Sequence, residues 1–325
     1  MVKKEPGTKK PRHKKTHRVA KSIRYLIGGI VIRIFFFIPY LLLLSRALSL
    51  SKLIAKIGYY IPGGYRRQAL ANLRLVFRNE KSHSELSEIA RKIGVDTIKG
   101  AFELAYSFSP RKGELYSSVD IEGIEHLKAA LNRGKGVIAL SAHLGNFTVM
   151  GGKFNSEGYP FYMVLKLPNN PGISEYLKMQ MERHNVKFIL ADPTIVSYKE
   201  IIRCLRRNEI VCLIADGDQK VGGIPVNLMG REIAIPPGPA ILARRTGAVI
   251  LPMFIIRQQD DSHKIIIETP VEMGEDESPD RAVVQLTIKL TRIIESYIHQ
   301  YPTQWYWVNK KHRHNRYREK LGRRP

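Results

Sequence analysis

The chain has 325 residues, 44% of them hydrophobic, which is enough to bury a substantial core. Its formal charge is +24, and much of the excess lies at the two ends, with ten Lys or Arg in residues 1–24 and eight in residues 309–325. Ends this basic are typical of segments that bind a polyanion, either nucleic acid, an anionic membrane surface or an acidic protein. The two cysteines, Cys204 and Cys212, exclude a disulfide framework, and we expect both to be reduced core residues.

Residues 23–44 (IRYLIGGIVIRIFFFIPYLLLL) form an apolar segment long enough to cross a bilayer, which takes about 20 residues. A signal peptide shares this layout, and residues 45–47 offer a small-x-small cleavage site, but the apolar run is too long and more Lys and Arg follow it. A central Arg33 is costly in a clean span. Because both flanks are basic, we favour an in-plane helix or a short hairpin over a span, with the rest of the chain in the cytoplasm.

Helices are expected next along the chain. Residues 61–77 follow a Pro-Gly-Gly breaker and place apolar residues at helical spacing, which predicts an amphipathic helix. Residues 83–108 begin with a cap-like pattern at Ser84, Ser87 and Glu88 and continue with the same spacing.

From residue 119 onward, strand-like and helix-like segments alternate. The expected strands are 119–123, 136–143, 161–166, 186–190, 210–216, 247–258 and 263–273. The expected helices are 124–133, 146–156, 173–184, 197–207 and 280–300. Alternation with continuously apolar strands predicts an α/β fold, with a largely parallel central sheet flanked by helices and preceded by the N-terminal hydrophobic anchor helix.

These patterns divide the chain into five parts. They are a disordered basic tail (1–22), a membrane anchor (23–44), a helical membrane-proximal region (45–110), an α/β domain (111–308) and a basic C-terminal tail (309–325).

Candidate functional residues lie at strand ends, where ligands of open α/β sheets gather. His143 follows an apolar strand and precedes a Gly-Asn turn, and Asp216 and Asp218 follow another strand. A histidine held by a carboxylate is a general base that can take a proton from a hydroxyl. If the two strands are neighbours, either aspartate can reach His143; otherwise the aspartates cap the next segment.

Four blocks resemble the bacterial lipid A biosynthesis (lauroyl/myristoyl) acyltransferases of the lysophospholipid acyltransferase superfamily. The blocks are SAHLGNF (141–147), LKLPNNPGISEYLKMQMERHNVKFI (165–189), ADGDQKVGGIPVNLMGREIAIPPGPAILARRTGAVILP (215–252) and YPTQWYWVNKKHR (301–313). With the apolar anchor, the resemblance covers nearly the whole chain.

The resemblance implies an O-acyltransferase of the inner membrane whose catalytic domain faces the cytoplasm. An acyl chain would move from an acyl carrier protein thioester to a hydroxyl of a lipid acceptor such as a lipid A precursor, with His143 as the general base and with no metal or cofactor. Coenzyme A as the donor and a lysophospholipid or ornithine-type lipid as the acceptor stay open.

Two residues depart from the family pattern. The family's motif is His, four residues, then Asp or Glu, but position 148 is Thr148, which orients a ring without supplying charge. Three interpretations follow. The acid comes from elsewhere, with Asp218 our first choice and Asp216 the second; Thr148 suffices alone; or the protein is a catalytically inactive relative that binds lipid or a partner. Lys166 replaces an arginine and loses its bidentate fork.

Further roles are implied by the resemblance. Lys166 and Arg183 would bind a substrate phosphate or the carrier's phosphopantetheine, Asn146 and Asn169 would bind the acyl carbonyl or acceptor, and Arg231 would belong to a turn facing the site. In the C-terminal block, Trp305 and Trp307 are expected in the core. The basic residues that follow are expected to dock either the acidic carrier protein or lipid phosphates: Lys310, Lys311 and Arg313.

A function of another class is a membrane-tethered nucleic-acid binder, because the tails are basic. The tails have little aromatic interleaving, only Tyr317, and the domain between them has no nucleic-acid motif, so this alternative ranks last and nucleic acid is not an expected partner.

Overall fold

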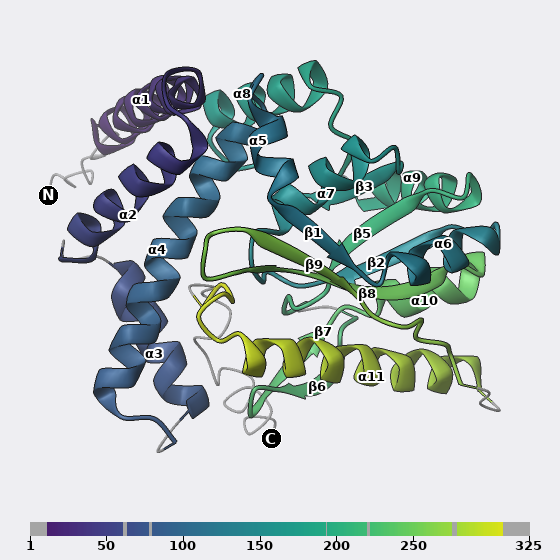
Figure 1. The fold of residues 1–325 in the computed structure, drawn as a ribbon. Helices are drawn as coiled ribbons and strands as arrows, with labels where there is room; N and C mark the ends of the chain where they lie inside the picture. Colours follow the sequence, from purple (N-terminus) through teal and green to yellow (C-terminus); the bar gives the residue numbers. More distant parts are fainter. Residues whose placement is uncertain are drawn as a thin grey trace, which may run out of the picture.

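A computed structural model describes residues 12–60, 64–77, 80–192, 194–219, 222–274 and 278–307. Its centre is a seven-stranded sheet in the order β1-β9-β8-β2-β5-β3-β4 (Figure 1). The strands are β1 (Val119–Glu122), β2 (Val137–Ser141), β3 (Phe161–Leu165), β4 (Phe188–Leu190), β5 (Ile210–Ile214), β8 (Val249–Arg257) and β9 (His263–Ile267). Every neighbouring pair is parallel except β8 and β9, so the predicted largely parallel α/β sheet is confirmed.

Helices cover both faces of the sheet. One face packs against α9 (Thr194–Arg206), α10 (Gly238–Thr246) and α11 (Pro279–Gln300), and the other against α5 (Lys112–Ser117), α6 (Ile124–Asn132) and α7 (Phe147–Ser156). The burial of strand β2 explains why its sequence is apolar up to the final Ser141. All five residues are buried, and because side chains alternate across a strand, Ile138 and Leu140 enter one core while Val137 and Ala139 enter the other.

The N-terminal helices pack beside the sheet. They are α1 (Arg12–Leu41), α2 (Leu44–Tyr60), α3 (Gly64–Phe77) and α4 (His83–Ser107), and α1 lies along α8 (Pro171–Arg183) (Figure 1). Helix α4 begins at His83 as predicted, but its N-cap is Ser82, which precedes the cap-like pattern expected at Ser84 and Ser87. Ser82 accepts from the Glu85 N–H at 3.3 Å and the Glu85 carboxylate accepts from the Ser82 N–H at 2.7 Å, which is a capping box.

Helix α1 begins before the predicted anchor. Residues 12–22, assigned to a disordered tail, are helical, because extending a helix costs less than starting one; residues 1–11 lie outside the described residues. Of the described helices, α1 alone has a segment, Ser22–Leu41, long and apolar enough to cross a membrane by length and composition, with a mean hydropathy of 1.7.

One side of α1 packs against the protein. Gly29 lies against the backbone of Gly172 in α8, and a Cβ at Gly172 would stand only 3.3 Å from the Gly29 Cα, which is a tight contact. The Arg33 guanidinium donates to the Gly29 carbonyl at 2.8 Å and lies 5.3 Å from the Tyr176 ring centroid. Arg33 is therefore partnered by protein groups on the α8 side.

Two features differ from the sequence prediction. A small antiparallel hairpin, β6 (Ile224–Leu228) and β7 (Arg231–Ile235), was not predicted, because Pro225 and a Gly-rich approach conceal its alternation. The last predicted strand, 263–273, ends early: β9 stops at Ile267, and only an isolated bridge from Ile250 to Val271 continues it.

Candidate active site

His143 stands just beyond the carboxyl end of β2, and Asp216 just beyond the carboxyl end of β5. The two strands are parallel neighbours in register, with Ser141 opposite Ile214, so their ends meet at the same edge of the sheet. Because strand neighbours lie about 4.8 Å apart, residues that follow the two strands come within contact distance. The predicted meeting of a strand-end histidine and a strand-end carboxylate therefore follows from strand order.

The Asp216 carboxylate is buried and accepts three hydrogen bonds. The Nδ1 of His143 donates to Oδ1 at 2.8 Å, and the His143 backbone N–H and the Trp305 indole N–H donate to Oδ2 at 3.1 and 2.7 Å. Burial alone would raise the pKa of Asp216, but the hydrogen bonds from His143 and Trp305 outweigh it and hold the pKa below its ordinary value. Asp216 is thus an ionised partner for the imidazole.

The structure corrects the first choice of partner. Asp218 was favoured, but its Oδ1 accepts from the Ala234 backbone N–H at 3.3 Å and supports the β7 strand. Asp216, the second choice, is the residue that holds the ring. A single residue, Gly217, separates them on the chain, and the deciding contact, from Trp305, comes from a segment 89 residues beyond Asp216.

The C-terminal segment pairs with the loop that follows His143. The Tyr306 N–H donates to the His143 carbonyl at 3.0 Å, and the Gly145 N–H donates to the Gln304 carbonyl at 2.9 Å. Gly145 has φ of 58°, and a Cβ there would collide with the Ile255 carbonyl, so glycine is required. Trp305 and Trp307 lie in the core, as predicted.

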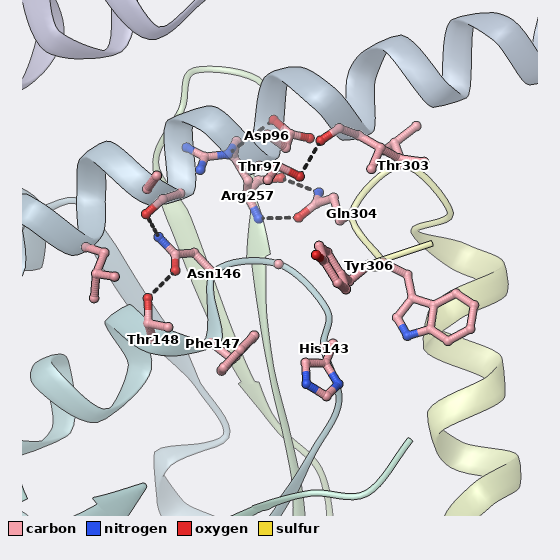
Figure 2. Close-up of a pocket in the computed structure, with 16 residues that line it drawn as sticks. Asp96, Thr97, His143, Asn146, Phe147, Thr148, Arg257, Thr303, Gln304 and Tyr306 are labelled. Carbon is pink, nitrogen blue, oxygen red and sulfur yellow. Dashed lines mark hydrogen bonds and ion pairs between the residues drawn. The ribbon is translucent and has the colours of Figure 1, made fainter. Parts of the chain in front are cut away.

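Thr148 faces Asn146. Its hydroxyl donates to the Asn146 amide oxygen at 2.5 Å (Figure 2). The Asn146 amide N–H groups donate to the Glu103 carboxylate at 2.6 Å and to the Gly100 carbonyl at 3.4 Å. Both N–H groups of Asn146 thus have partners within the protein, although the residue lines the cavity, and its role in binding substrate stays a prediction. The Thr148 hydroxyl thus bonds to the Asn146 amide. In the family motif, an acid at this position would be expected to orient the histidine.

Sequence reasoning missed Glu103 and Arg257. Glu103 on α4 is fully buried and forms a bidentate pair with Arg257 of β8 at 2.5 and 2.7 Å. The amphipathic pattern of α4 makes an acid at position 103 look like a surface residue. The one available signal is a second charge four residues earlier, at Lys99, on the same helix face.

A cavity of about 290 Å³ opens beside His143 between α4 and the C-terminal segment. Its walls are mainly apolar and include Ile93, Ala101, Leu104, Phe147 and Tyr306. Figure 2 shows His143 at one end of the cavity and a cluster of polar side chains, Asp96, Thr97 and Arg257, at the other end. The His143 side chain is 38% exposed, so the ring reaches the cavity while its Nδ1 is bound by Asp216. The site can therefore hold an apolar chain next to an oriented imidazole.

The other predicted binding residues lie outside the walls of this cavity. Lys166 pairs with Asp192 at 2.9 Å on the surface, and Asn169 is exposed in the following loop. Arg183 is exposed at the end of α8, and Arg231, half-buried, begins β7. Lys166 nevertheless directly follows β3, and β3 lies two strands from β2, so the backbones at Lys166 and His143 are about 10 Å apart across the same sheet edge. Lys310, Lys311 and Arg313 lie outside the described residues.

Among the described residues, no group of three or more His, Cys, Asp or Glu is arranged to hold a metal ion. The expectation that the reaction needs no metal or cofactor stays a prediction.

A mainly parallel sheet covered by helices, with a carboxylate-held histidine at a strand end beside a cavity, defines the chain as an α/β enzyme. Its particular family follows from sequence comparison: residues 11–314 match the model of the bacterial lipid A biosynthesis acyltransferase family, and the chain belongs to that family. The protein is therefore an acyltransferase of the lipid A and lysophospholipid type, as the motifs predicted.

Several characterised proteins are similar to it. The lipid A biosynthesis palmitoleoyltransferase of Escherichia coli is 22% identical over 253 residues, covering 76% of this chain and 78% of that protein. The phosphatidylinositol mannoside acyltransferase of Mycolicibacterium smegmatis is 25% identical over 200 residues, covering 60% of this chain and 63% of the relative. Among solved structures, the 1-acyl-sn-glycerophosphate (LPA) acyltransferase PlsC of Thermotoga maritima matches with a TM-score of 0.35 and 13% identity, covering 76% of this chain and 97% of that one. At that score the likeness carries no argument about the site.

Proposed function

We propose that the protein transfers an acyl chain from acyl carrier protein to a hydroxyl of a membrane lipid, with His143 as the general base and Asp216 as the residue that orients it. The observation that carries this proposal is the pair itself: an ionised, buried carboxylate 2.8 Å from Nδ1 of a histidine that lines the cavity. The first interpretation of Thr148, in which the acid comes from elsewhere in the chain, is the one this geometry supports.

The chemistry follows from the tautomer. Because Nδ1 donates to Asp216, the acceptor hydroxyl gives its proton to Nε2 as its oxygen attacks the thioester carbonyl. The C–S bond then breaks, and the thiol leaves with the proton that the imidazolium returns. Asp216 stays ionised and stabilises the imidazolium between the two steps. The mainly apolar cavity suits the acyl chain of either substrate.

Membrane attachment is the second part of the proposal. The side of α1 that faces away from α8 is apolar and exposed along its length: Ile23, Leu26, Ile27, Ile30, Val31, Ile34, Phe37 and Leu41. These residues recur at spacings of three and four, so they share one face. A helix packed on one side and apolar on the other suits an in-plane anchor at the cytoplasmic face of the inner membrane.

The donor is a finer point of the same proposal. An acyl carrier protein is acidic and would be attracted by a chain with a formal charge of +24. Lys166, at the sheet edge near His143, is the described residue that we assign to the phosphate of its prosthetic group, since a lysine supplies a point charge for phosphate. Coenzyme A carries phosphates of its own, so the experiment compares both donors.

Incubation of purified protein with acyl carrier protein or coenzyme A thioesters and a panel of lipid acceptors, followed by mass spectrometry, tests the function. We expect a new O-acyl lipid and release of free thiol with the carrier donor. His143→Ala should lower turnover by about 100-fold or more, the scale of lost general-base catalysis, and leave the unfolding temperature within a few degrees. Retained turnover in that variant would remove His143 from the mechanism, and no product with any acceptor would favour the inactive-relative interpretation.

A further inference from the structure

The starting point is the environment of Glu103, which sits on α4 with no exposed surface. Its carboxylate accepts from both terminal nitrogens of Arg257, at 2.5 and 2.7 Å, and from the Asn146 amide at 2.6 Å. His263 lies next to it, with Nε2 at 3.5 Å from the carboxylate. A buried carboxylate is tolerated only when it is paired and fully hydrogen-bonded. Glu103 meets this condition by bonding to the loop that carries His143.

Asn146 connects Glu103 to that loop. It is the first residue before α7, a position where an asparagine side chain ordinarily caps the helix, yet it makes no cap hydrogen bond. Its amide instead bridges two elements, donating to Glu103 and accepting from the Thr148 hydroxyl at 2.5 Å. Thr148 is therefore separated from the Glu103 carboxylate by a single amide group.

Arg257 holds the other side of the same loop. Its backbone N–H donates to the Gln304 side-chain oxygen at 2.8 Å and its carbonyl accepts from the Gln304 amide at 2.9 Å. The Gln304 carbonyl in turn accepts from the Gly145 N–H at 2.9 Å. The Glu103–Arg257 pair thus fixes the loop at Gly145 and at Asn146, directly after His143.

We propose that Glu103 is a positioning residue for the reaction. Its carboxylate, on α4, anchors the loop that carries His143, and it acts through Asn146. Positions 103 and 148 therefore share one place for an acid, which means that only one of the two can carry a carboxylate. This inference rests on the proposed function for His143 and adds a residue that acts through Asn146. A carboxylate at position 148 would meet the acceptor oxygen of Asn146 and lie close to Glu103, and like charges in a buried site repel each other. An acid is accommodated at 148 only when the charge at 103 is removed.

A double-mutant cycle tests this exchange. Glu103→Gln keeps the shape of the side chain, removes its charge and should lower kcat by about tenfold, since small misplacements of catalytic groups have effects of this order. The KM for the lipid acceptor should stay within about twofold, because the residue touches no substrate. Thr148→Asp alone should lower kcat to a similar extent. The double variant should recover to within about threefold of the unmodified enzyme, a coupling expected only of residues in one network.

The controls separate positioning from stability. Glu268→Gln changes another carboxylate, one that accepts from the Tyr297 hydroxyl outside the cavity, and it should lower the unfolding temperature while leaving kcat within about twofold. Hydrogen exchange of the peptide spanning residues 139–150 should become faster in Glu103→Gln and return toward normal in the double variant. This readout does not depend on turnover, so it stands even if His143→Ala shows that the proposed function is wrong.

Three results would overturn the inference. They are unchanged kcat in Glu103→Gln, losses that multiply in the double variant, and an equal loss of kcat in Glu268→Gln. Thr148→Asp leaves the ion pair intact and keeps the test valid if Glu103→Gln does not fold: an unchanged or higher kcat in Thr148→Asp would by itself rule out the shared place for an acid.

Discussion

At the scale of single residues, the acid in the site is defined by its hydrogen bonds. Asp216 and Asp218 both follow β5, but Asp216 is the one whose carboxylate accepts hydrogen bonds from His143 and Trp305. Three donors offset the cost of burying its charge and keep its pKa low, with burial opposing them. The imidazole therefore faces a fixed negative charge at neutral pH, which a threonine hydroxyl does not provide.

The buried His263 gives a prediction for stability against pH. Burial is the largest cause and lowers its pKa to about 4, since it outweighs the Glu103 and Asp261 carboxylates, which raise the pKa, while Arg257 and Lys99 lower it further. Between about pH 4 and 6.5 the unfolded chain binds a proton at this residue and the folded chain does not. The free energy of unfolding should therefore fall as the pH is lowered through this range, by up to about 1.4 kcal/mol per pH unit.

Urea unfolding at pH 5, 6 and 7 checks this prediction by comparing the protein with His263→Leu. The variant should lose the part of the pH dependence that His263 contributes, whatever its stability at pH 7. If the free energy of unfolding changed with pH to the same extent in both proteins, His263 would have its ordinary pKa in the folded state.

The sequence located His143 and the pair of aspartates because strand ends are readable from apolar runs and the glycines after them. It did not distinguish Asp216 from Asp218, since that choice depends on where the Trp305 indole arrives from the far end of the chain. Glu103 was missed for the same reason. Its burial depends on Arg257, which is 154 residues away, and no local pattern reports such a contact.

At the scale of elements, helix α1 has two unlike sides. Its packed side carries Gly28, Gly29 and Phe36 against α8 and α4, and its other side is a continuous apolar face in which Ile27 is 54% and Ile34 is 65% exposed. A helix surrounded by lipid would not need such a packed side. The arrangement therefore supports attachment in the plane of the membrane and leaves the α8 contact intact.

Charges placed on the apolar face should release the protein from membranes. Ile27→Glu combined with Ile34→Glu should reduce co-sedimentation with vesicles of phosphatidylethanolamine and phosphatidylglycerol by about tenfold or more, because each charge opposes burial in the acyl boundary. Gln285→Glu with Gln300→Glu on the exposed side of α11 adds the same net charge and should leave binding nearly unchanged. Equal binding of all three proteins would mean that the apolar face of α1 does not contact lipid.

Most elements were predicted because their patterns are local. The Val- and Ile-rich strand 247–258 became β8 (Val249–Arg257), and the amphipathic segment 280–300 became α11 (Pro279–Gln300). The β6–β7 hairpin was not predicted because a proline argues against a strand. Pro225 lacks a backbone N–H and is tolerated in the hairpin only where the hydrogen-bond ladder does not require that N–H. The short α5 was missed because six residues contain too little periodicity to recognise.

At the scale of the whole molecule, the boundary expected at residue 110 passes through the site. Helix α4, assigned to the membrane-proximal region, lines the cavity and binds β8 through Glu103 and Arg257. The opposite wall is the C-terminal segment at 303–306. Helix α4 and the C-terminal end of the described chain therefore enclose one cavity, and both lie within the family match over residues 11–314.

The central claim is that His143, held by Asp216, catalyses acyl transfer, and the two aspartates after β5 provide a matched pair to test it. The measurement is kcat for lipid O-acylation in Asp216→Asn and Asp218→Asn. We expect Asp216→Asn to lose about 100-fold or more, because an amide neither fixes the Nδ1–H tautomer nor stabilises the imidazolium. Asp218→Asn should stay within about threefold, since its amide oxygen still accepts from the Ala234 N–H. A large loss in Asp218→Asn with normal turnover in Asp216→Asn would contradict the account.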